Sequence, residues 1–376
     1  MTGLYLHIPF CKQSCHYCNF HFSTSQNNRD EVLTAINKEI NQKALGFKDK
    51  ISTIYFGGGT PTILTEKELN TIIENILKKF DVKKNIEITV EANPDDLTKS
   101  KLSALSNSVV NRISIGVQSF IDEELKSMNR AHDSKKAIKS IEMARKYFEN
   151  ISIDILYGLP ESSLDSCNYN LDFIQKFDLN HISAYALTIE PKTALQTFLK
   201  KSIIEMPDEQ LVYDQFKLIN ERLTNRGFIN YEVCSFAKKD FFSQNNSAYW
   251  LRKKYIGIGP SAHSFDGNFR SWNISNNKKY IDHINQGLSY FKKEKLTRID
   301  HYNEYIMTGL RTIWGISTEY IESNFNANFK NYFLEKIQKH IVQKNVEIKD
   351  NVYLTTNSGR FLADGIASDL FLVNLK

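Results

Sequence analysis

The stretch YLHIPFCKQSCHYC, residues 5–18, places a short apolar run directly before three closely spaced cysteines. The run at residues 4–8 predicts a buried strand, so Cys11, Cys15 and Cys18 lie on the loop that follows it. Three thiolates on one loop can hold three irons of a cubane [4Fe-4S] cluster. The fourth iron then remains open to a chelating ligand, and the amino and carboxylate groups of a methionine moiety suit it.

Zinc is the alternative metal for these thiols, with His16 or His21 as the fourth ligand. The spacing C-x3-C-x2-C is not a zinc-finger spacing, which favours the cluster. The other cysteines, Cys167 and Cys234, stand alone in the sequence and are expected to pack like small hydrophobic residues. The chain has five cysteines, an odd number, and three of them are clustered, which argues against a set of disulfides. This usage is typical of proteins from compartments where thiols stay reduced.

The composition is that of an ordinary globular protein, with 41% hydrophobic and 24% charged residues among 376. The 48 Lys and Arg residues exceed the 43 Asp and Glu residues by too little to predict a nucleic-acid partner. No apolar run reaches the roughly 18 residues of a membrane span, and the N-terminus does not resemble a signal peptide. We therefore expect a cytoplasmic protein that does not span a membrane.

Beyond the cysteine loop, the first half of the chain repeats a strand–loop–helix unit. Segments with helical spacing separate the apolar runs, and one of them opens with a capping box at residues 65–68. Strands that alternate with helices predict a parallel sheet. Because a seventh and an eighth unit are not evident, we expect an α/β fold built on a partial (β/α)6 barrel over residues 1–227. The six predicted strands lie at residues 4–8, 53–56, 86–90, 112–117, 151–156 and 181–187.

The alternation stops after about residue 225. Residues 228–298 are rich in aromatic residues and asparagine, and we expect a connecting segment with a glycine turn at residues 257–260. Residues 299–376 have a compact helical pattern that ends in a strand, a polar turn and a closing helix. This order predicts a small, mostly helical, winged-helix-like domain at the C-terminus.

Polar residues and glycines recur where the predicted strands end. Barrel-type folds place their active sites at the carboxyl ends of the strands, so these residues are expected to converge on one mouth. A helix cap or a turn would explain any one of them singly. Together they suit a dipolar ligand, because carboxylates can bind ribose hydroxyls or an ammonium and a guanidinium can bind a carboxylate. The set comprises Gly57, Gly58, Gly59, Thr60, Glu91, Gln118, Arg130, Asp154 and Tyr185.

The cysteine loop and the GGGTP motif at residues 57–61 together resemble the radical S-adenosylmethionine (SAM) superfamily. The stretch at residues 5–11 is similar to the oxygen-independent coproporphyrinogen III oxidase family, and within it to the haem-chaperone (HemW-like) branch; the resemblance extends to Leu370. It implies a [4Fe-4S] cluster on the three cysteines and SAM bound by Tyr5 and the strand-end residues. It also implies haem as a ligand that passes to an acceptor protein, which the sequence does not identify. Whether the protein forms a homodimer is not determined by the sequence.

One segment departs from the pattern of that branch. The haem chaperones carry His-Asn-x-x-Tyr-Trp, a segment tied to haem binding, and residues 245–250 here read NNSAYW. An asparagine amide is a poor ligand for haem iron, which argues against ligation through Asn245. Asn246 and Tyr249 remain candidates for haem contact. His263 is another source of imidazole, although a structural role beside the glycine turn is favoured for it.

Two departures from the oxidase pattern favour a haem chaperone over an enzyme. The oxidases continue their cysteine motif with Cys-x-Cys, and Phe20 stands at the last of these positions. Only ten residues precede Cys11, too few to cover a porphyrin-sized substrate and to shield a radical from water. The alternative is an oxygen-independent coproporphyrinogen III oxidase that acts by a 5′-deoxyadenosyl radical. A third possibility is a binding module in which the cluster only fastens the fold or a dimer and SAM is not cleaved.

Overall fold

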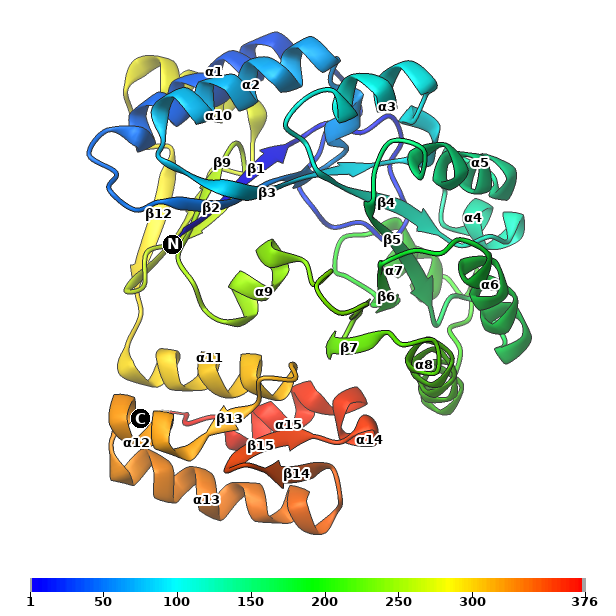
Figure 1. Cartoon of the computed structure of the whole chain (residues 1–376), viewed down its shortest axis with the longest axis vertical. Helices are drawn as coiled ribbons and strands as arrows, with labels where there is room; N and C mark the ends of the chain where they lie inside the picture. The colour runs from blue at the N-terminus through cyan, green and yellow to red at the C-terminus, as the bar shows by residue number, and fades with distance from the viewer. Residues whose placement is uncertain (1, 374–376) are drawn as a thin grey trace.

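A computed structural model describes residues 2–373 of the chain. Its centre is a parallel sheet whose strands follow one another in chain order, as the sequence predicted (Figure 1). These strands are β1 (Thr2–Ile8), β2 (Ile51–Gly58), β3 (Val82–Ala92), β4 (Arg112–Gln118), β5 (Asn150–Tyr157) and β6 (His181–Ala186). Every predicted strand is present, and each overlaps the predicted residues.

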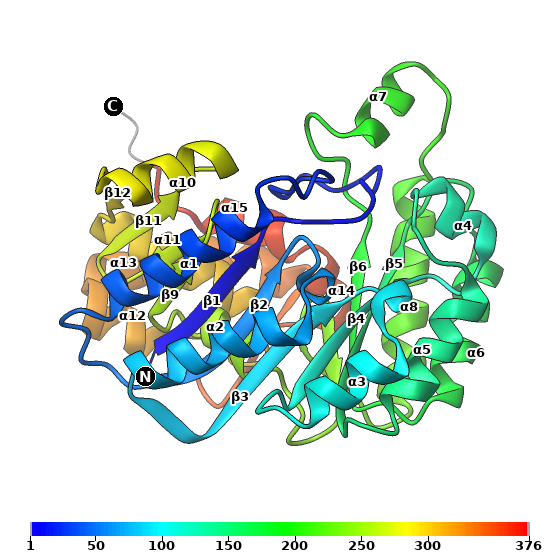
Figure 2. The same ribbon diagram turned by 90° about the horizontal axis from the view of Figure 1, so that it is seen from above.

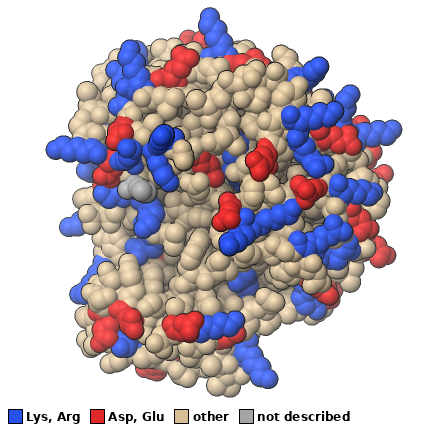
Figure 3. Space-filling view, viewed as in Figure 1, with Lys and Arg blue, Asp and Glu red and all other residues tan. Residues whose placement is uncertain are grey.

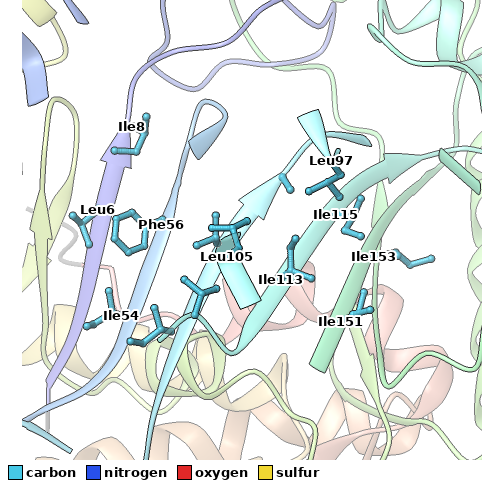
Figure 4. Packing of buried hydrophobic residues seen from close by; sticks show 14 of the residues in the cluster. Leu6, Ile8, Ile54, Phe56, Leu97, Leu105, Ile113, Ile115, Ile151 and Ile153 are labelled. Atoms are coloured by element: carbon cyan, nitrogen blue, oxygen red, sulfur yellow. The ribbon is translucent and has the colours of Figure 1, made fainter. Parts of the chain in front are cut away.

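Helices cover the outer face of this sheet. Alternate residues of β1 explain the layer, because Leu4, Leu6 and Ile8 are fully buried while Tyr5 and His7 face the other side. Figure 4 shows the buried side chains of neighbouring strands packed against residues before and in the helix that follows β3. The helices are α1 (Arg29–Ala44), α2 (Glu66–Lys79), α3 (Lys99–Ser106), α4 (Asp122–Ser127), α5 (Ser134–Ala144), α6 (Leu164–Lys176) and α8 (Glu209–Thr224), with short 3-10 turns η1 (Pro61–Ile63) and η2 (Pro94–Asp96).

Residues 228–298 extend the sheet at both edges, which the sequence pattern did not predict. Beyond β6 lies β8 (Ser235–Ala237), which pairs antiparallel with β6, and beyond β8 lies β7 (Ile229–Glu232), which pairs antiparallel with β8. Beside β1 lies the parallel strand β9 (Tyr255–Ile258), followed by antiparallel β10 (His263–Phe265), β11 (Phe269–Asn273) and β12 (Phe291–Lys295). The sheet therefore has twelve strands among the described residues. The same segment carries α9 (Gln244–Trp250) and α10 (Asn277–Gln286).

The C-terminal domain lies across the open side of the sheet, and α9 lies between the two (Figure 1). A helix, a short strand, two helices and a β-hairpin follow one another, the order of a winged helix, with a hydrophobic core of their own. The elements are α11 (Arg298–Leu310), β13 (Ile316–Ser317), α12 (Thr318–Phe325), α13 (Ala327–Val342), β14 (Val346–Lys349), β15 (Val352–Thr355), α14 (Asn357–Phe361) and α15 (Ala363–Leu370).

This domain is attached to both edges of the sheet. At the β7 edge, the backbone N–H of Val233 donates to the carbonyl of Arg311 at 2.9 Å, and the buried guanidinium of Arg360 donates to the carbonyl of Asn230 at 2.6 Å. At the opposite edge, Arg270 of β11 forms a 2.6 Å ion pair with Glu304 of α11. The C-terminal domain therefore spans the gap that the incomplete barrel leaves.

Basic and acidic side chains are interspersed over the face seen in Figure 3. Among residues 2–373, no helix combines the length and the apolar character that a membrane crossing requires.

Candidate functional site

The three cysteines lie on the loop directly after β1, and all three side chains are half-buried. The loop is held at its base by backbone hydrogen bonds from Gly59 to the carbonyl of Ile8 at 2.8 Å and from Thr60 to the carbonyl of Phe10 at 2.7 Å. Figure 2 shows this loop and the segment that carries α7 (Ala194–Lys200) on the same side of the sheet, beyond the carboxyl ends of the strands. The cysteines thus lie where the sequence placed the mouth of the barrel.

Two donors reach the sulfur atoms. The Thr60 hydroxyl donates to Cys11 Sγ at 3.5 Å, and Arg130 Nη1 donates to Cys15 Sγ at 3.2 Å. Burial raises the pKa of Cys11 to about 11, and the positive charge of Arg130 opposes that rise. Hydrogen bonds and positive charge stabilise thiolate ligands, so these surroundings fit an iron–sulfur cluster. Within the described part, no three His, Cys, Asp or Glu side chains lie close enough together to bind one metal ion. A cubane cluster does not require such close approach, because each thiolate would bind a different iron.

The glycines of the GGGTP motif have close neighbours in the protein itself. A Cβ at Gly59 would lie 2.5 Å from the carbonyl oxygen of Phe10, and one at Gly58, whose φ is +105°, would meet the His7 ring at 2.7 Å. The motif therefore lets the end of β2 lie against the cysteine loop. This contact is a second reason for glycine here, beside the access for a ligand that the sequence suggested.

Two carboxylates lie inside the barrel near these loops. Glu91 accepts a 2.7 Å hydrogen bond from the Tyr55 hydroxyl, and burial raises its pKa to about 7. Burial also raises the pKa of Asp154 to about 6, although hydroxyls of Ser183 and Ser114 and the charge of Arg112 oppose the rise. Desolvation dominates both pKa values, because it penalises the charged form. Two buried carboxyls that ionise near neutral pH suit a cationic ligand.

The remaining strand-end residues take two different places. Gln118 ends β4 with φ +71°, and Arg130 donates to the carbonyl of the neighbouring Gly116 at 2.7 Å. These two therefore lie with the cysteine loop and the carboxylates. Tyr5 and Tyr185 instead line a large adjacent cavity.

This cavity measures about 1190 Å³ and lies between the inner face of the sheet, α9 and the C-terminal domain. Its walls combine aromatic side chains with basic and acidic ones, and they include the candidate haem contacts Asn246, Tyr249 and His263. The acidic residues are Glu232, Glu304 and Asp364. The sequence did not point to the basic residues, because they lie outside any motif, on β11 and just after the ends of α9 and α11. They are Arg252, Lys253, Arg270 and Arg311.

Asn245 faces away from this cavity. Its side chain is 2% exposed and accepts a 3.1 Å hydrogen bond from the Thr53 hydroxyl, beside Gly3 at the start of β1. Its backbone N–H donates to the buried Glu87 carboxylate at 3.1 Å. The neighbouring Asn246, one residue further along α9, lines the cavity. Position 245 is therefore a packing position between α9 and the sheet.

Comparison with known proteins agrees with this arrangement. The model of the radical SAM superfamily matches residues 5–174, and the model of the HemN C-terminal domain matches residues 296–362. The chain is 34% identical to the heme chaperone HemW of Bacillus subtilis, over 97% of this chain and 98% of that protein. The chain belongs to the HemW family of radical SAM proteins. This HemW-family chain is also 31% identical to the heme chaperone HemW of Lactococcus lactis, with 91% of this chain and 90% of that protein covered.

A solved structure gives the fold of the HemW-family chain independently. Coproporphyrinogen III oxidase from Escherichia coli superposes with a TM-score of 0.85 at 24% identity, over 98% of this chain and 90% of that one. The predicted fold class is thereby confirmed, and the family models and the HemW relatives confirm the resemblance noted from the sequence. Membership of the superfamily implies a [4Fe-4S] cluster and SAM.

Proposed function

We propose that this protein is a haem chaperone, which binds a [4Fe-4S] cluster, SAM and haem and passes the haem to an acceptor protein. The observation that carries the proposal is the 1190 Å³ cavity, whose walls contain aromatic side chains and arginines beside three carboxylates, in a chain that aligns over 97% of its length with a protein named a heme chaperone. Aromatic side chains pack well against the faces of a flat macrocycle, and guanidinium groups bind carboxylates such as haem propionates.

In this proposal the cluster binds to Cys11, Cys15 and Cys18, and a bound cluster supplies an open iron and an electron. Thr60 and Arg130 donate hydrogen bonds to two of the sulfur atoms. Because Arg130 also lies beside the strand ends, it is placed to bind the carboxylate of SAM as well. Phe198 of α7 packs edge-on against His16 at 4.9 Å between ring centroids, which holds α7 over the cysteine loop.

SAM is proposed to lie between the cysteine loop and the carboxyl ends of the strands. Gly57, Gly58 and Gly59 would present backbone groups to its methionine end, and Gln118 would add an amide. Glu91 and Asp154 are proposed to bind its ribose hydroxyls or its positive charge, which their burial favours because it raises both pKa values despite the charge of Arg112. Tyr5 lies at the boundary between this site and the haem cavity, since its hydroxyl pairs with His7 Nδ1 at 3.2 Å and its ring lines the cavity.

The competing function is that of a coproporphyrinogen III oxidase. Its support is the shared fold with the Escherichia coli enzyme. Against it stands Phe20, which occupies the place of the additional cysteine of the oxidase motif and is 68% exposed at the rim of the cavity. An exposed aromatic side chain there suits contact with a macrocycle or a protein partner better than metal binding.

One anaerobic experiment separates the two functions. The reconstituted protein is titrated with haem and, separately, incubated with coproporphyrinogen III, SAM and a reductant. We expect saturable haem binding and no release of carbon dioxide. Carbon dioxide from the porphyrinogen without saturable haem binding would replace the chaperone by the oxidase. Measuring 5′-deoxyadenosine in the same reaction shows whether SAM is cleaved.

A further inference from the structure

Three histidines line the haem cavity, and they differ in what their ring nitrogens contact. His7 has both nitrogens engaged, Nδ1 with the Tyr5 hydroxyl at 3.2 Å and Nε2 with the carbonyl of His21 at 2.8 Å. His21 has Nε2 engaged with the amide oxygen of Asn277 at 2.8 Å. Among the contacts of the described residues, neither nitrogen of His263 has a hydrogen-bond partner. Of these three histidines, His263 is therefore the one with both ring nitrogens unengaged by the described residues, whereas His21 has only Nδ1 without a partner among them and is held by Asn277.

The position of His263 is fixed by its backbone. It begins β10 directly after the turn at residues 257–260, and it pairs with Trp272 of β11. The two rings stack at 6.3 Å between centroids with an interplanar angle of 26°. The imidazole is exposed towards the cavity, while its strand is held on the other side by β9. A ring that is supported on one face and free at its nitrogens is preorganised to bind a metal.

The charges around His263 are compatible with that role. Burial and the positive charge of Arg270 lower the pKa of His263, so its imidazole is neutral at pH 7 and keeps a nitrogen lone pair. Arg270 lies on the strand paired with β10 and lines the same cavity. Arg270 is thus a cation close to the imidazole; it is paired with Glu304 at 2.6 Å, so a propionate would share or replace that carboxylate.

We propose that His263 is the axial ligand of haem iron in this protein. The proposal rests on the haem-chaperone function proposed above and names the ligand that the segment at residues 245–250 lacks. Because Asn245 points towards Thr53, even a histidine at that position would face the sheet and not the cavity. Cys234 is the main rival ligand, since it also lines the cavity; burial raises the pKa of its thiol to about 12, which disfavours the thiolate.

The test is a haem titration of the full-length reconstituted protein, followed by absorption and EPR spectroscopy. We expect the wild type to show an imidazole-ligated spectrum. His263→Ala should lose that spectrum and bind haem at least about tenfold more weakly, because losing even a residue that orients a metal ligand costs about that much in affinity. Added imidazole should restore the spectrum of His263→Ala, which a merely structural role would not permit.

Three variants make the outcome specific. His301→Ala, which removes a histidine that lines a neighbouring cavity, should leave the spectrum unchanged. Asn245→His should not shift the spectrum, and Cys234→Ser should keep the imidazole signature. An unchanged spectrum in His263→Ala, or a lost one in Cys234→Ser, would overturn His263 as the ligand while the chaperone function stands. A wild type that shows no saturable haem binding would overturn both proposals.

Discussion

The thiol of Cys15 shows what a single residue contributes to the cluster site. Its sulfur accepts a hydrogen bond from the buried Arg130, and the two cysteines outside the loop lie elsewhere, Cys167 buried in α6 and Cys234 between β7 and β8. We expect Cys15→Ala to lose the cluster, since two thiolates do not hold a cubane securely. Iron and sulfide analysis after anaerobic reconstitution checks this. Cys167→Ala is the matched control and should keep its iron; near-normal iron in Cys15→Ala would contradict the assignment.

Glu91 should give the proposed SAM site a pH dependence. Its pKa of about 7 means that the ligand-free protein holds a proton on Glu91 below pH 7, and a cationic ligand has to displace that proton. SAM should therefore bind about tenfold more weakly at pH 6 than at pH 8, with nearly one proton released per ligand at pH 6 and almost none at pH 8. Calorimetry of the reconstituted protein at the two pH values measures the difference.

Two variants test whether Glu91 is the source. Glu91→Gln should weaken binding at pH 8 and remove most of the pH dependence, because an amide does not titrate. Glu335→Gln alters an exposed carboxylate on α13 and should keep the wild-type profile. Equal affinity of the wild type at both pH values would show that Glu91 does not face the ligand.

The position of a site residue could be predicted from the sequence only where the residue belongs to a short local motif. The cysteines and glycines lie in short motifs whose spacing already dictates one loop and one turn. Asn245 could not be placed, because neighbouring residues of a helix point in different directions and only the packing of α9 on Thr53 decides which one faces the cavity. Arg252 and Arg270 belong to no motif, and they meet only because the turn after α9 and strand β11 each bring an arginine to Glu304.

The turn after β2 acts as an element that positions the cysteine loop. A Cβ at Gly59 would approach the carbonyl oxygen of Phe10 to 2.5 Å, and the backbone there cannot move without shifting β1. We expect Gly59→Ala to destabilise the protein by about 1–3 kcal/mol, as overpacking does, and to lower cluster loading. Urea denaturation and iron analysis measure the two effects. Gly365→Ala, in α15 with open space around it, should cost nothing; equal stability of both variants would contradict the contact.

Elements were predictable where they were long and regular. The central strands carry apolar runs that could be recognised in the sequence. The start of α2 could be recognised by the capping box between Thr65 and Glu68, which the structure contains. Strands β7 to β12 are three to five residues long, and every residue of β12 is exposed and most are charged. Such short edge strands are stabilised by their neighbours in the sheet rather than by their own pattern, so periodicity could not reveal them.

At the scale of the whole molecule, the C-terminal domain completes a site that the barrel alone leaves open. It supplies Glu304, Met307 and Arg311 to the cavity wall, while the sheet supplies His263 and Arg270. The two edges are fastened differently. Contacts at β7 are buried, whereas the pair between Arg270 and Glu304 is partly open to solvent and is expected to contribute little. The position of the domain therefore depends mainly on the β7 edge.

Arg360 is the residue on which that attachment can be tested. Its guanidinium is 8% exposed and donates to the backbone carbonyl and the side-chain oxygen of Asn230, while Phe361 packs on Phe216 at 5.4 Å between ring centroids. Arg360→Ala leaves a buried carbonyl without its charged donor, a loss of about 1.5–3 kcal/mol. We expect this variant to be cleaved faster by proteases in the segment that joins β12 to α11, and to bind haem more weakly. Iron content should stay normal, because the cysteine loop is carried by β1, which pairs with β2 and β9.

The combination of results separates a local defect from the loss of the domain contact. Arg226→Ala removes an exposed hydrogen bond to the carbonyl of Gln175 and should leave proteolysis and haem binding unchanged. If Arg360→Ala loses haem affinity and gains protease sensitivity while keeping its iron, the cavity depends on a docked C-terminal domain. If haem affinity is unchanged despite faster proteolysis, haem is held by the sheet and α9 alone, and the C-terminal domain serves another purpose.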